Sequence, residues 1–579
     1  MIDTTNRNTA LASALVEELA RSGVRRAILS PGSRSSPVAL ALDREPGIEL
    51  TVVLDERSAG FVALGTALAT GAPAIVTCTS GSAAANLHPA VVEADEAGVP
   101  LIVLTSDRPP ELRGIGAGQT IDQIGLYGSA IRWFCEAGTH DADDEGVLFM
   151  RSLGCRAWAE SKRGRGPVHL NLPWRDPLGP EPVEGAVTAA RPLALEGRSE
   201  GRPLTVPIDG RRPAPELVES LAAAVGGAGR GLIVAGRHLD HDLPDAIAAL
   251  AAKAGFPVLA EPTSGLRLGA PAGTTVIGSY DLIARSTPRH LAPDFVLRFG
   301  DMPTSKPLRA WLDGLEVDRI VIDPPGRWDD PSRIAGAFVR ADAAALASAV
   351  SEALPESADG AWARSWERAE DEAQVAIDSL LATEAGTTEP GIARAVGGSL
   401  APGDAVLIAS SMPIRDAEAF FHPSAAPVVV RSNRGANGID GLVSTACGLA
   451  LGSGKPTWLL VGDLALAHDI GGLASVAGLD SPLRIVCIDN GGGGIFDFLP
   501  QAGQVEADRF SRLFTTPSSL DLERAAALFG IDYARIEDEA GITSLAGSGT
   551  VLAHVPVERR GNVDLHRRIG EAVSAAISA

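Results

Sequence analysis

The sequence predicts an α/β protein with three doubly wound domains, each built on a parallel sheet. The chain has 579 residues, which is several times the usual size of one domain. Its apolar segments are short and continuous, without alternation, and stretches of helical character separate them. Continuous apolar strands are typical of a sheet that helices cover on both faces, which is the arrangement of parallel sheets.

The first predicted domain covers residues 1–185. Strands are expected at residues 24–29, 50–54, 74–77, 100–105 and 168–172, and helices at residues 58–70 and 82–96. The stretch at about residues 179–215 is rich in Pro, Gly, Arg and Glu and shows no periodicity. Such a composition predicts a linker that crosses the surface.

Two further predicted domains follow, at residues 205–355 and 362–579. The second has expected strands at residues 231–235, 257–260, 295–299 and 319–322, and is expected to end near residues 354–360. The third begins with a charged helix at residues 362–381 and has expected strands at residues 405–409, 428–430, 458–461, 484–488 and 551–555. The first and third domains have similar size and the same alternation, which suggests a duplicated fold.

The charge of the chain restricts its partners. The formal net charge is -22 and the isoelectric point is about 4.9, so most of the surface repels nucleic acid and anionic lipid. An anion site in such a protein needs local arginine side chains and main-chain N–H groups. The five cysteines show no C-x-x-C spacing, and no apolar run reaches 18 residues. We therefore expect a soluble, unprocessed, cytoplasmic protein that binds neither nucleic acid nor membrane.

Two polar motifs in the third domain predict a metal site. Gly462-Asp463 follows one expected strand, and residues 489–494 (Asp-Asn-Gly-Gly-Gly-Gly) follow the next. The carboxyl ends of strands are where open α/β sheets bind ligands. A carboxylate, an amide oxygen and exposed main-chain carbonyls are hard ligands that suit Mg²⁺. Each motif alone is more typical of a turn or a loop, but their spacing across one strand-helix-strand unit favours the metal site.

The paired motifs resemble those of the thiamine diphosphate enzymes, whose motif begins with Gly-Asp-Gly and closes with Asn-Asn. Leu464 replaces the third glycine here, and Asp489 replaces the first asparagine. The resemblance implies thiamine diphosphate as cofactor, held through Mg²⁺ or Mn²⁺. The implied metal ligands are Asp463, Asn490 and the main chain of Gly492. The Asp-Leu pair and the run at residues 494–496 (Gly-Ile-Phe) are most similar to the branch of the family that acts in menaquinone biosynthesis.

Glu56 is the first catalytic candidate. It lies where an expected strand ends and a helix begins, and an acidic first turn stabilised by the helix dipole is the ordinary explanation for it. In the resembled family, the glutamate of this motif hydrogen-bonds the aminopyrimidine ring and stabilises the imino tautomer that removes the C2 proton of the thiazolium. That role needs a carboxyl group that can share a proton near neutrality, which burial favours.

Further motifs of the same family occur in both outer domains, in the family's order. They are residues 30–37 (SPGSRSSP), 106–112 (SDRPPEL), 116–119 (GAGQ), 410–416 (SSMPIRD) and 432–441 (SNRGANGIDG). Any one of them could be a surface loop with a solvated arginine, which is the commoner fate of that residue. Their joint occurrence favours the family.

The resemblance implies two dicarboxylate substrates, 2-oxoglutarate and isochorismate. Planar guanidinium groups bind carboxylates in a bidentate manner, so arginines suit both. The matching positions are Arg34, Arg108, Arg415 and Arg434, with Ser33, Gln119 and Ser411 as neutral donors. Gln119, Ser411 and Arg415 join Glu56 as catalytic candidates. Lys306 matches a basic substrate contact from the middle domain, although Pro307 replaces a second basic residue of some relatives and a solvated lysine is nearly as well supported.

The same resemblance assigns contacts to the cofactor. Ile439 would be the bulky apolar residue that holds the cofactor in its bent form, and Ile495 and Phe496 would line the pocket beside the thiazolium. Core packing is an equally ordinary role for these three side chains. The other implied cofactor contacts are Glu56, Ser411, Gly462, Asp463, Leu464, Asn490 and Gly492.

The implied activity is that of a transferase of menaquinone biosynthesis. It would decarboxylate 2-oxoglutarate and add the resulting enamine to isochorismate in a Stetter-like step, with loss of CO₂. In this family the cofactor lies between the first domain of one subunit and the third domain of another, so a homodimer or homotetramer is implied. The alternatives are an acetolactate synthase-like enzyme, a simple 2-oxo acid decarboxylase, and a non-catalytic ligand sensor that keeps the fold.

Overall fold

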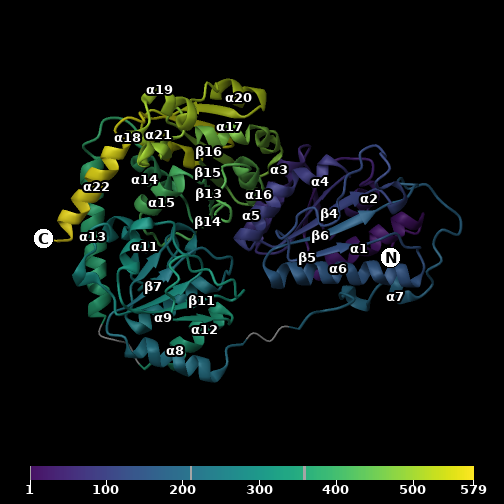
Figure 1. The fold of residues 1–579 in the computed structure, drawn as a ribbon, viewed down its shortest axis with the longest axis horizontal. Coiled ribbons are helices and arrows are strands. Elements are labelled where there is room, and N and C mark those ends of the chain that lie inside the picture. Colours follow the sequence, from purple (N-terminus) through teal and green to yellow (C-terminus); the bar gives the residue numbers. More distant parts are fainter. Residues whose placement is uncertain (1, 209–211, 356–359, 579) are drawn as a thin grey trace. The chain divides into compact units, whose positions relative to one another are not determined.

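The structure is a computed structural model that describes residues 2–208, 212–355 and 360–578, and it contains three six-stranded parallel sheets (Figure 1). The predicted fold class is therefore confirmed. Residues 209–211 of the predicted linker and residues 356–359, at the predicted end of the second domain, lie outside the described residues. The limits of the three domains stay predictions.

The chain divides into two compact units. Unit 1 comprises Met1–Asp209, Asn433–Gly454 and His468–Asp480. Unit 2 comprises Gly210–Ser432, Lys455–Ala467 and Ser481–Ala579. The first sheet lies in unit 1, and the second and third sheets lie in unit 2, so two segments of the third predicted domain pack within unit 1.

The first sheet has the strand order β2-β1-β3-β4-β6-β5. Its strands are β1 (Arg26–Leu29), β2 (Glu49–Val52), β3 (Ala74–Cys78), β4 (Leu101–Asp107), β5 (Trp133–Glu136) and β6 (Pro167–Pro173). Its helices are α1 (Arg7–Ser22), α2 (Ser36–Arg44), α3 (Glu56–Thr70), α4 (Ser82–Asn86), α5 (His88–Ala97) and α6 (Asp144–Gly164). Helices α1 and α6 lie side by side and share an apolar core with this sheet (Figure 1).

The third sheet repeats this topology. Its order is β14-β13-β15-β16-β18-β17, which is the order of the first sheet with every strand number raised by the same amount. The strands are β13 (Ala405–Ile408), β14 (Val429–Arg431), β15 (Thr457–Gly462), β16 (Leu483–Asp489), β17 (Asp532–Arg535) and β18 (Val551–Pro556). The helices include α13 (Ala361–Leu381), α14 (Glu389–Ser399), α15 (Met412–Phe420), α16 (Leu442–Ser453), α17 (Asp463–His468) and α22 (Asn562–Ala576). The duplication suggested by the sequence is thus present in the fold.

The second sheet has the order β12-β11-β10-β7-β8-β9. Its strands are β7 (Gly231–Ala235), β8 (Val258–Ala260), β9 (Val276–Ile277), β10 (Phe295–Phe299), β11 (Asp318–Ile322) and β12 (Ala337–Val339), with helices α8 (Pro215–Gly227), α9 (Leu243–Ala254), α10 (Tyr280–Ala284), α11 (Lys306–Asp313) and α12 (Ala343–Ala353). One buried apolar cluster runs from this part of unit 2 into the third sheet and includes the fully buried Trp366 and Trp458. The two sheets of unit 2 are therefore joined by a common core.

The sequence missed four strands, and all four lie at the edge of a sheet. They are β5, β9, β12 and β17. Each is short, and none is buried along its whole length, so none carries the continuous apolar run that marks a central strand. The helix expected at residues 82–96 also differs, since it is divided into α4 and α5 at Leu87, just before Pro89 in the first turn of α5.

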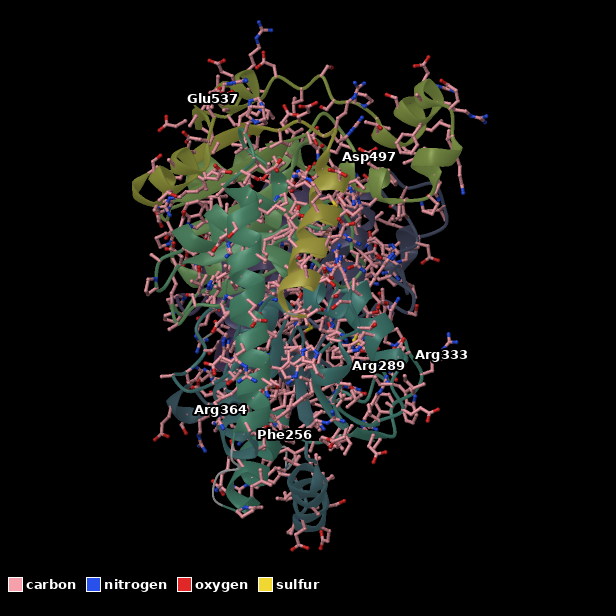
Figure 2. The ribbon with its side chains drawn as sticks, turned by 90° about the vertical axis from the view of Figure 1, so that its left-hand side faces the viewer. Phe256, Arg289, Arg333, Arg364, Asp497 and Glu537 are labelled. Atoms are coloured by element: carbon pink, nitrogen blue, oxygen red, sulfur yellow. The ribbon has the colours of Figure 1, made fainter. Side chains whose placement is uncertain are left out.

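Charged side chains of both signs lie on the surface of unit 2. Figure 2 shows the charged side chains of Arg333 and Glu537 extending outward from the ribbon, and both residues are exposed. Among the described residues, no helix combines the length and the apolar character that crossing a membrane requires.

Helix α16 is held in unit 1 by close packing on α3. A Cβ atom at Gly448 would lie 2.0 Å from the carbonyl oxygen of Val62, and one at Gly65 would lie 2.0 Å from that of Thr445. The two backbones therefore approach as closely as glycine alone permits. Because α16 directly follows residues 433–441, this contact also fixes the segment that carries Arg434 and Ile439.

We predict that Gly448→Ala destabilises the protein by about 3 kcal/mol, because the added methyl group meets backbone atoms that cannot move aside cheaply. The measurement is urea unfolding of the variant and the wild type. Gly398→Ala is the matched control, since Gly398 lies in α14 with no atom within 4 Å of the added Cβ. There, alanine should be neutral or should stabilise by up to about 1 kcal/mol. Equal stability of the two variants would contradict the packing described for α3 and α16.

Candidate active site

The carboxyl ends of β15 and β16 bring an acid and an amide together in unit 2. The two strands are parallel neighbours, and Gly462 pairs with Ile488 at the end of their register. Asp463 is the next residue after β15, and Asn490 follows directly after β16. The point where the strand order reverses lies between β13 and β15, which is where open α/β sheets bind ligands.

Asp463 is buried with half of its hydrogen-bonding capacity unused. It is 5% exposed, and its Oδ1 accepts a hydrogen bond of 2.8 Å from the N–H of Leu464. Its Oδ2 is buried and accepts none. Burial, together with the nearby charge of Asp489 and against main-chain hydrogen bonds that lower it, raises the pKa of Asp463 to about 6. Its surroundings therefore disfavour the charged form of this carboxylate.

Asn490 shows the same pattern. Its Nδ2 donates a hydrogen bond of 2.8 Å to Oε1 of Glu389, the first residue of α14. Its Oδ1 is buried and has no hydrogen-bond partner. Burial, and next the charge of Asp416, raises the pKa of Glu389. The amide of Asn490 is thus bound on its NH₂ side by a buried acid, while its oxygen accepts no hydrogen bond.

Two buried oxygens without donors fit a divalent cation. Buried polar atoms in proteins nearly always have partners, so an orphaned carboxylate oxygen and an orphaned amide oxygen on adjacent strand ends call for a ligand. Both are hard oxygen donors of the kind that Mg²⁺ and Mn²⁺ prefer. No group of three or more His, Cys, Asp and Glu side chains with metal-binding geometry occurs in the described part of the chain. The expected ligand set contains only one such side chain, so this finding does not conflict with it.

Gly492 supplies the third expected ligand position, through its carbonyl. Its φ is 134°, and a Cβ atom there would lie 2.3 Å from the carbonyl oxygen of Thr515. Only glycine fits this turn. The carbonyl of Gly492 accepts a hydrogen bond of 2.9 Å from Gly494, which leaves one lone pair for a further partner.

The remaining expected cofactor contacts lie around these strand ends. Gly462 ends β15 and Leu464 lies in the first turn of α17. Ile495 and Phe496 lie in the 3₁₀ helix Gly494–Phe498 and are half-buried, and the ring of Phe496 is 5.7 Å from that of Phe514. Phe496 therefore contributes to apolar packing in addition to any contact with a cofactor.

Ser411 and Arg415 lie at the start of α15, on the other side of the reversal point. Ser411 is the N-cap and has a φ of 80°, a conformation that a residue with a side chain rarely adopts. The guanidinium of Arg415 donates to the carbonyl of Ser411, and burial lowers the pKa of Arg415. Lys306, in contrast, is an exposed side chain at the first position of α11.

Glu56 and the remaining expected residues lie in unit 1. Glu56 is the half-buried first residue of α3, behind the N-cap Asp55, whose carboxylate accepts a hydrogen bond of 3.1 Å from Ser58. The charge of Glu56 adds to burial in raising the pKa of the buried Cys78 at the end of β3. Glu56 therefore lies at the same edge of the first sheet as the end of its central strand.

Arg34, Arg108 and Gln119 are brought together at this edge. Arg108 donates to Oγ of Ser80 at 3.1 Å, and Gln119 donates to the carbonyl of Ser80 at 3.0 Å. Arg34 is 8% exposed and donates to the carbonyl of Trp174, and its Nε has no partner. Burial, and then the charge of Arg108, lowers the pKa of Arg34. The charges of Asp176 and Asp107 oppose this repulsion between the two guanidinium groups, and the Nε of Arg34 is left for a further acceptor such as an anion. The neighbouring Ser33 is exposed.

Arg434 and Ile439 lie in the segment of unit 1 that precedes α16. The N–H groups of Gly435 and Ala436 donate to the carboxylate of Glu93 on α5 at 2.8 and 2.7 Å. Arg434 and Ile439 are both half-buried. The segment is thus anchored to the first domain by its backbone, which leaves the side chain of Ile439 only partly covered.

A buried polar network supports the loop that carries Gln119. His169 and Asn171 on β6 both contact Oγ1 of Thr105, at 2.7 and 2.9 Å. Nε2 of Gln123 donates to Oδ1 of Asn171, and Oε1 of Gln123 accepts from Gly81, the residue after Ser80. Burial lowers the pKa of His169 to about 3, so this ring is neutral inside the sheet.

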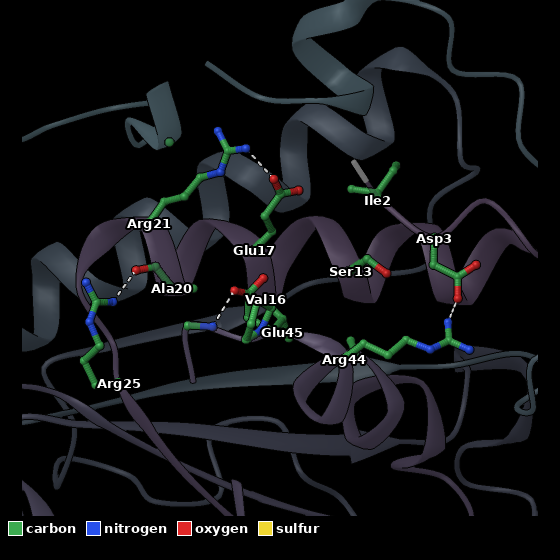
Figure 3. Close-up of a pocket in the computed structure, with 14 residues that line it drawn as sticks. Ile2, Asp3, Ser13, Val16, Glu17, Ala20, Arg21, Arg25, Arg44 and Glu45 are labelled. Carbon is green, nitrogen blue, oxygen red and sulfur yellow. Dashed lines mark hydrogen bonds and ion pairs between the residues drawn. The ribbon is translucent and has the colours of Figure 1, made fainter. Parts of the chain in front are cut away.

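Unit 1 also has a surface cavity of about 880 Å³ that contains none of the elements described above as carrying site residues. It is lined by α1 and by the end of α2 (Figure 3). Three arginines and three acids line it, and Arg21 and Arg44 pair with Glu17 and Asp3 (Figure 3). None of the site residues expected from the sequence belongs to its lining. We therefore do not regard it as part of the active site.

The sequence did not predict the residues that support the expected site residues from behind. Glu389 stands in Thr388-Glu389-Pro390, which predicts a capped helix start and nothing more. Gln123 and Asn171 are ordinary polar residues in the sequence. Their roles depend on contacts between segments far apart in the chain, and no local pattern signals such contacts.

Three family models match the chain, one for each sheet. They are described as the thiamine pyrophosphate enzyme N-terminal TPP binding domain (residues 9–126), the middle domain of thiamine pyrophosphate (residues 219–407) and the thiamine pyrophosphate enzyme C-terminal TPP binding domain (residues 422–548). Thiamine pyrophosphate is another name for thiamine diphosphate. Fold, strand ends and matches together define the class of the thiamine diphosphate enzymes.

Curated relatives show which family of this class the chain belongs to. Two relatives are named 2-succinyl-5-enolpyruvyl-6-hydroxy-3-cyclohexene-1-carboxylate synthase, and each is 42% identical to the chain. The match with the protein from Myxococcus xanthus covers 99% of the chain and 98% of the relative. The match with the protein from Chloroflexus aurantiacus covers 98% of the chain and 96% of the relative. The protein of the same name from Geobacillus kaustophilus is 39% identical over 98% of both chains. The chain belongs to the family of 2-succinyl-5-enolpyruvyl-6-hydroxy-3-cyclohexene-1-carboxylate synthases.

The buried His169 predicts a loss of stability in acid. Its pKa is about 3 in the folded chain, against an ordinary value of 6.5, so the unfolded chain takes up a proton first as the pH falls. Stability is therefore full above pH 6.5 and is lost between pH 6.5 and pH 3, by about 2 kcal/mol between pH 7 and pH 5.

His169→Gln removes this titration while keeping a donor for Thr105. Urea unfolding at pH 7 and at pH 5 should therefore show a smaller acid-induced loss in this variant than in the wild type. The matched control is His422→Gln, since His422 is exposed and should change nothing. The same loss in His169→Gln as in the wild type would refute the assignment.

Proposed function

We propose that this protein uses thiamine diphosphate and a divalent cation to decarboxylate 2-oxoglutarate and to join the remaining carbon unit to isochorismate. The product is 2-succinyl-5-enolpyruvyl-6-hydroxy-3-cyclohexene-1-carboxylate, an intermediate of menaquinone biosynthesis. The observation that carries the proposal is the pair of orphaned buried oxygens on Asp463 and Asn490, in a chain of this family. Family membership does not favour the acetolactate synthase-like alternative.

In this proposal, unit 2 holds the phosphate end of the cofactor. Asp463, Asn490 and the carbonyl of Gly492 would hold Mg²⁺ or Mn²⁺, which would neutralise the negative charge of the diphosphate. The N-terminus of α17, which begins at Asp463, adds a favourable dipole for phosphate oxygens. When bound, the cofactor supplies the carbon nucleophile and the electron sink that the amino acid side chains lack.

Unit 1 supplies the proton chemistry. Glu56 shares a proton with the aminopyrimidine ring, and its place at the start of α3 fixes the carboxyl group in a half-buried position. Ile439 presses on the cofactor from a segment whose backbone Glu93 anchors. The role of these groups is to hold and position, which is worth most when their geometry is rigid.

The arginines bind the substrate carboxylates. The repulsion between Arg34 and Arg108, which the charges of Asp176 and Asp107 oppose, favours a substrate carboxylate beside them. Gln119 and Ser33 add neutral donors beside them. Arg415, Arg434 and Lys306 are the further cationic contacts, and Ser411 is a neutral donor on the strained turn before α15.

The proposal includes an assembly of at least two chains, in the cytoplasm. In this family the cofactor is held jointly by two subunits, which is why a dimer is the smallest complete unit. Whether two or four chains assemble is measured by light scattering coupled to size exclusion, and a strictly monomeric active protein would contradict this part of the proposal.

Product analysis tests the activity directly. We expect that protein, Mg²⁺, thiamine diphosphate, 2-oxoglutarate and isochorismate together yield the coupled adduct and CO₂, as detected by mass spectrometry. Omission of isochorismate is the control, since it removes the acceptor. Release of CO₂ with no adduct in the complete mixture would identify a simple 2-oxo acid decarboxylase instead.

Glu56→Gln separates catalysis from binding. Because the amide cannot share a proton with the cofactor, we expect turnover to fall at least about 100-fold, the usual range for an acid–base group, with cofactor binding retained. The matched control is Glu216→Gln, which removes an exposed first-turn acid from α8 and loses the same dipole interaction. Equal activity of both variants would favour the helix-dipole explanation, or a ligand sensor, over catalysis.

A further inference from the structure

Glu389 lies directly behind the expected metal ligand Asn490. Its Oε1 accepts the 2.8 Å hydrogen bond from Nδ2 of Asn490, and its side chain is only 2% exposed. It is fixed at the first position of α14, where the N-cap Thr388 accepts a hydrogen bond from Gly391. The carboxylate therefore comes from a rigid helix start and meets a strand end that is distant in the sequence.

This contact decides which end of the amide faces the site. An asparagine side chain can turn either its oxygen or its NH₂ group toward a neighbour, and the two arrangements differ little in shape. A carboxylate only accepts hydrogen bonds, so Glu389 selects the NH₂ group of Asn490. The Oδ1 atom is thereby turned away from Glu389, and it is the atom that is buried without a partner.

We propose that Glu389 is a positioning residue that orients Asn490 so that its amide oxygen, and not its NH₂ group, faces the divalent cation. The inference rests on the metal site of the proposed function. Residues behind metal ligands commonly fix their orientation, and their loss weakens metal binding about 10- to 100-fold. Without Glu389, no acceptor behind Asn490 holds its NH₂ group away from the cation before the cation binds.

The surroundings of Glu389 support a role beyond helix capping. Asp416 on α15 and Asp463 both contribute negative charge at its carboxylate. Glu389 is a first-turn acid, which the dipole of α14 favours, but burial and the two neighbouring acids oppose its charge. A cation bound beside Asn490 would offset that opposition.

The test is a set of variants with Mg²⁺ affinity as the readout. Mg²⁺ is titrated calorimetrically into protein with excess thiamine diphosphate, and folding is monitored by circular dichroism. Glu389→Gln should bind Mg²⁺ at least about 10-fold more weakly, because glutamine accepts and donates equally well and no longer selects one orientation of Asn490. Glu370→Gln is the matched control, since Glu370 is also buried in unit 2 and accepts a hydrogen bond from Ser279.

An exchanged pair gives a second, independent readout. Asn490→Asp alone places two carboxylates against each other and should weaken Mg²⁺ binding. The double variant Glu389→Gln with Asn490→Asp restores one donor and one acceptor in the reverse order, and should recover affinity relative to both single variants. A purely structural role of Glu389 predicts no such recovery.

The outcomes separate this inference from the function on which it rests. If wild-type protein binds no Mg²⁺ in the presence of the cofactor, the proposed metal site fails. If wild-type protein binds Mg²⁺, but Glu389→Gln binds it equally well or the exchanged pair recovers nothing, the positioning role is overturned and the metal site stands. A loss in Glu370→Gln as large as that in Glu389→Gln would also overturn it.

Discussion

The placement of Asp463 and Asn490 depends on the parallel pairing of β15 with β16. Six residue pairs keep the two strands in register from Thr457 to Gly462, so that both strands end at the same level. This places Asp463 and Asn490 beside each other without any help from flexible loops. Both then bury an oxygen that accepts no hydrogen bond, a costly arrangement that persists only where the rest of the fold enforces it. A bound cation would remove that cost, which is the basis of the proposed metal site.

The two outer sheets share one topology, but the side chains at their strand ends carry charges of opposite sign. In both sheets, the expected site residues follow the two strands at which the strand order reverses, or the next strand of the sheet. The reversal lies between β1 and β3 in the first sheet and between β13 and β15 in the third. In the first sheet these ends carry Arg34 and Arg108, which suits carboxylates. In the third they carry Asp463 and, from the adjoining helix, Glu389, which suits a cation. Because the net charge of the chain is -22, the pair Arg34 and Arg108 is a local exception to the overall negative charge.

Much of this could be predicted from the sequence, because the informative signals are local. Most central strands of the three sheets contain a run of apolar residues, and Asp463 and Asn490 directly follow two of them. The edge strands such as β5 and β17 escaped prediction, since one side of an edge strand meets solvent and its apolar run is interrupted. Glu389 escaped because its contact with Asn490 joins residues 101 positions apart. The predicted roles of the individual site residues remain predictions.

The central claim is that Asp463 and Asn490, which follow β15 and β16, bind a divalent cation. Counting bound Mn²⁺ by electron paramagnetic resonance, with thiamine diphosphate present, tests this most directly, because free and bound Mn²⁺ give different signals. The account predicts one bound Mn²⁺ per chain for the wild type, and loss of that ion in the isosteric variant Asp463→Asn with its fold intact. Retention of the ion by Asp463→Asn at the same affinity would contradict it.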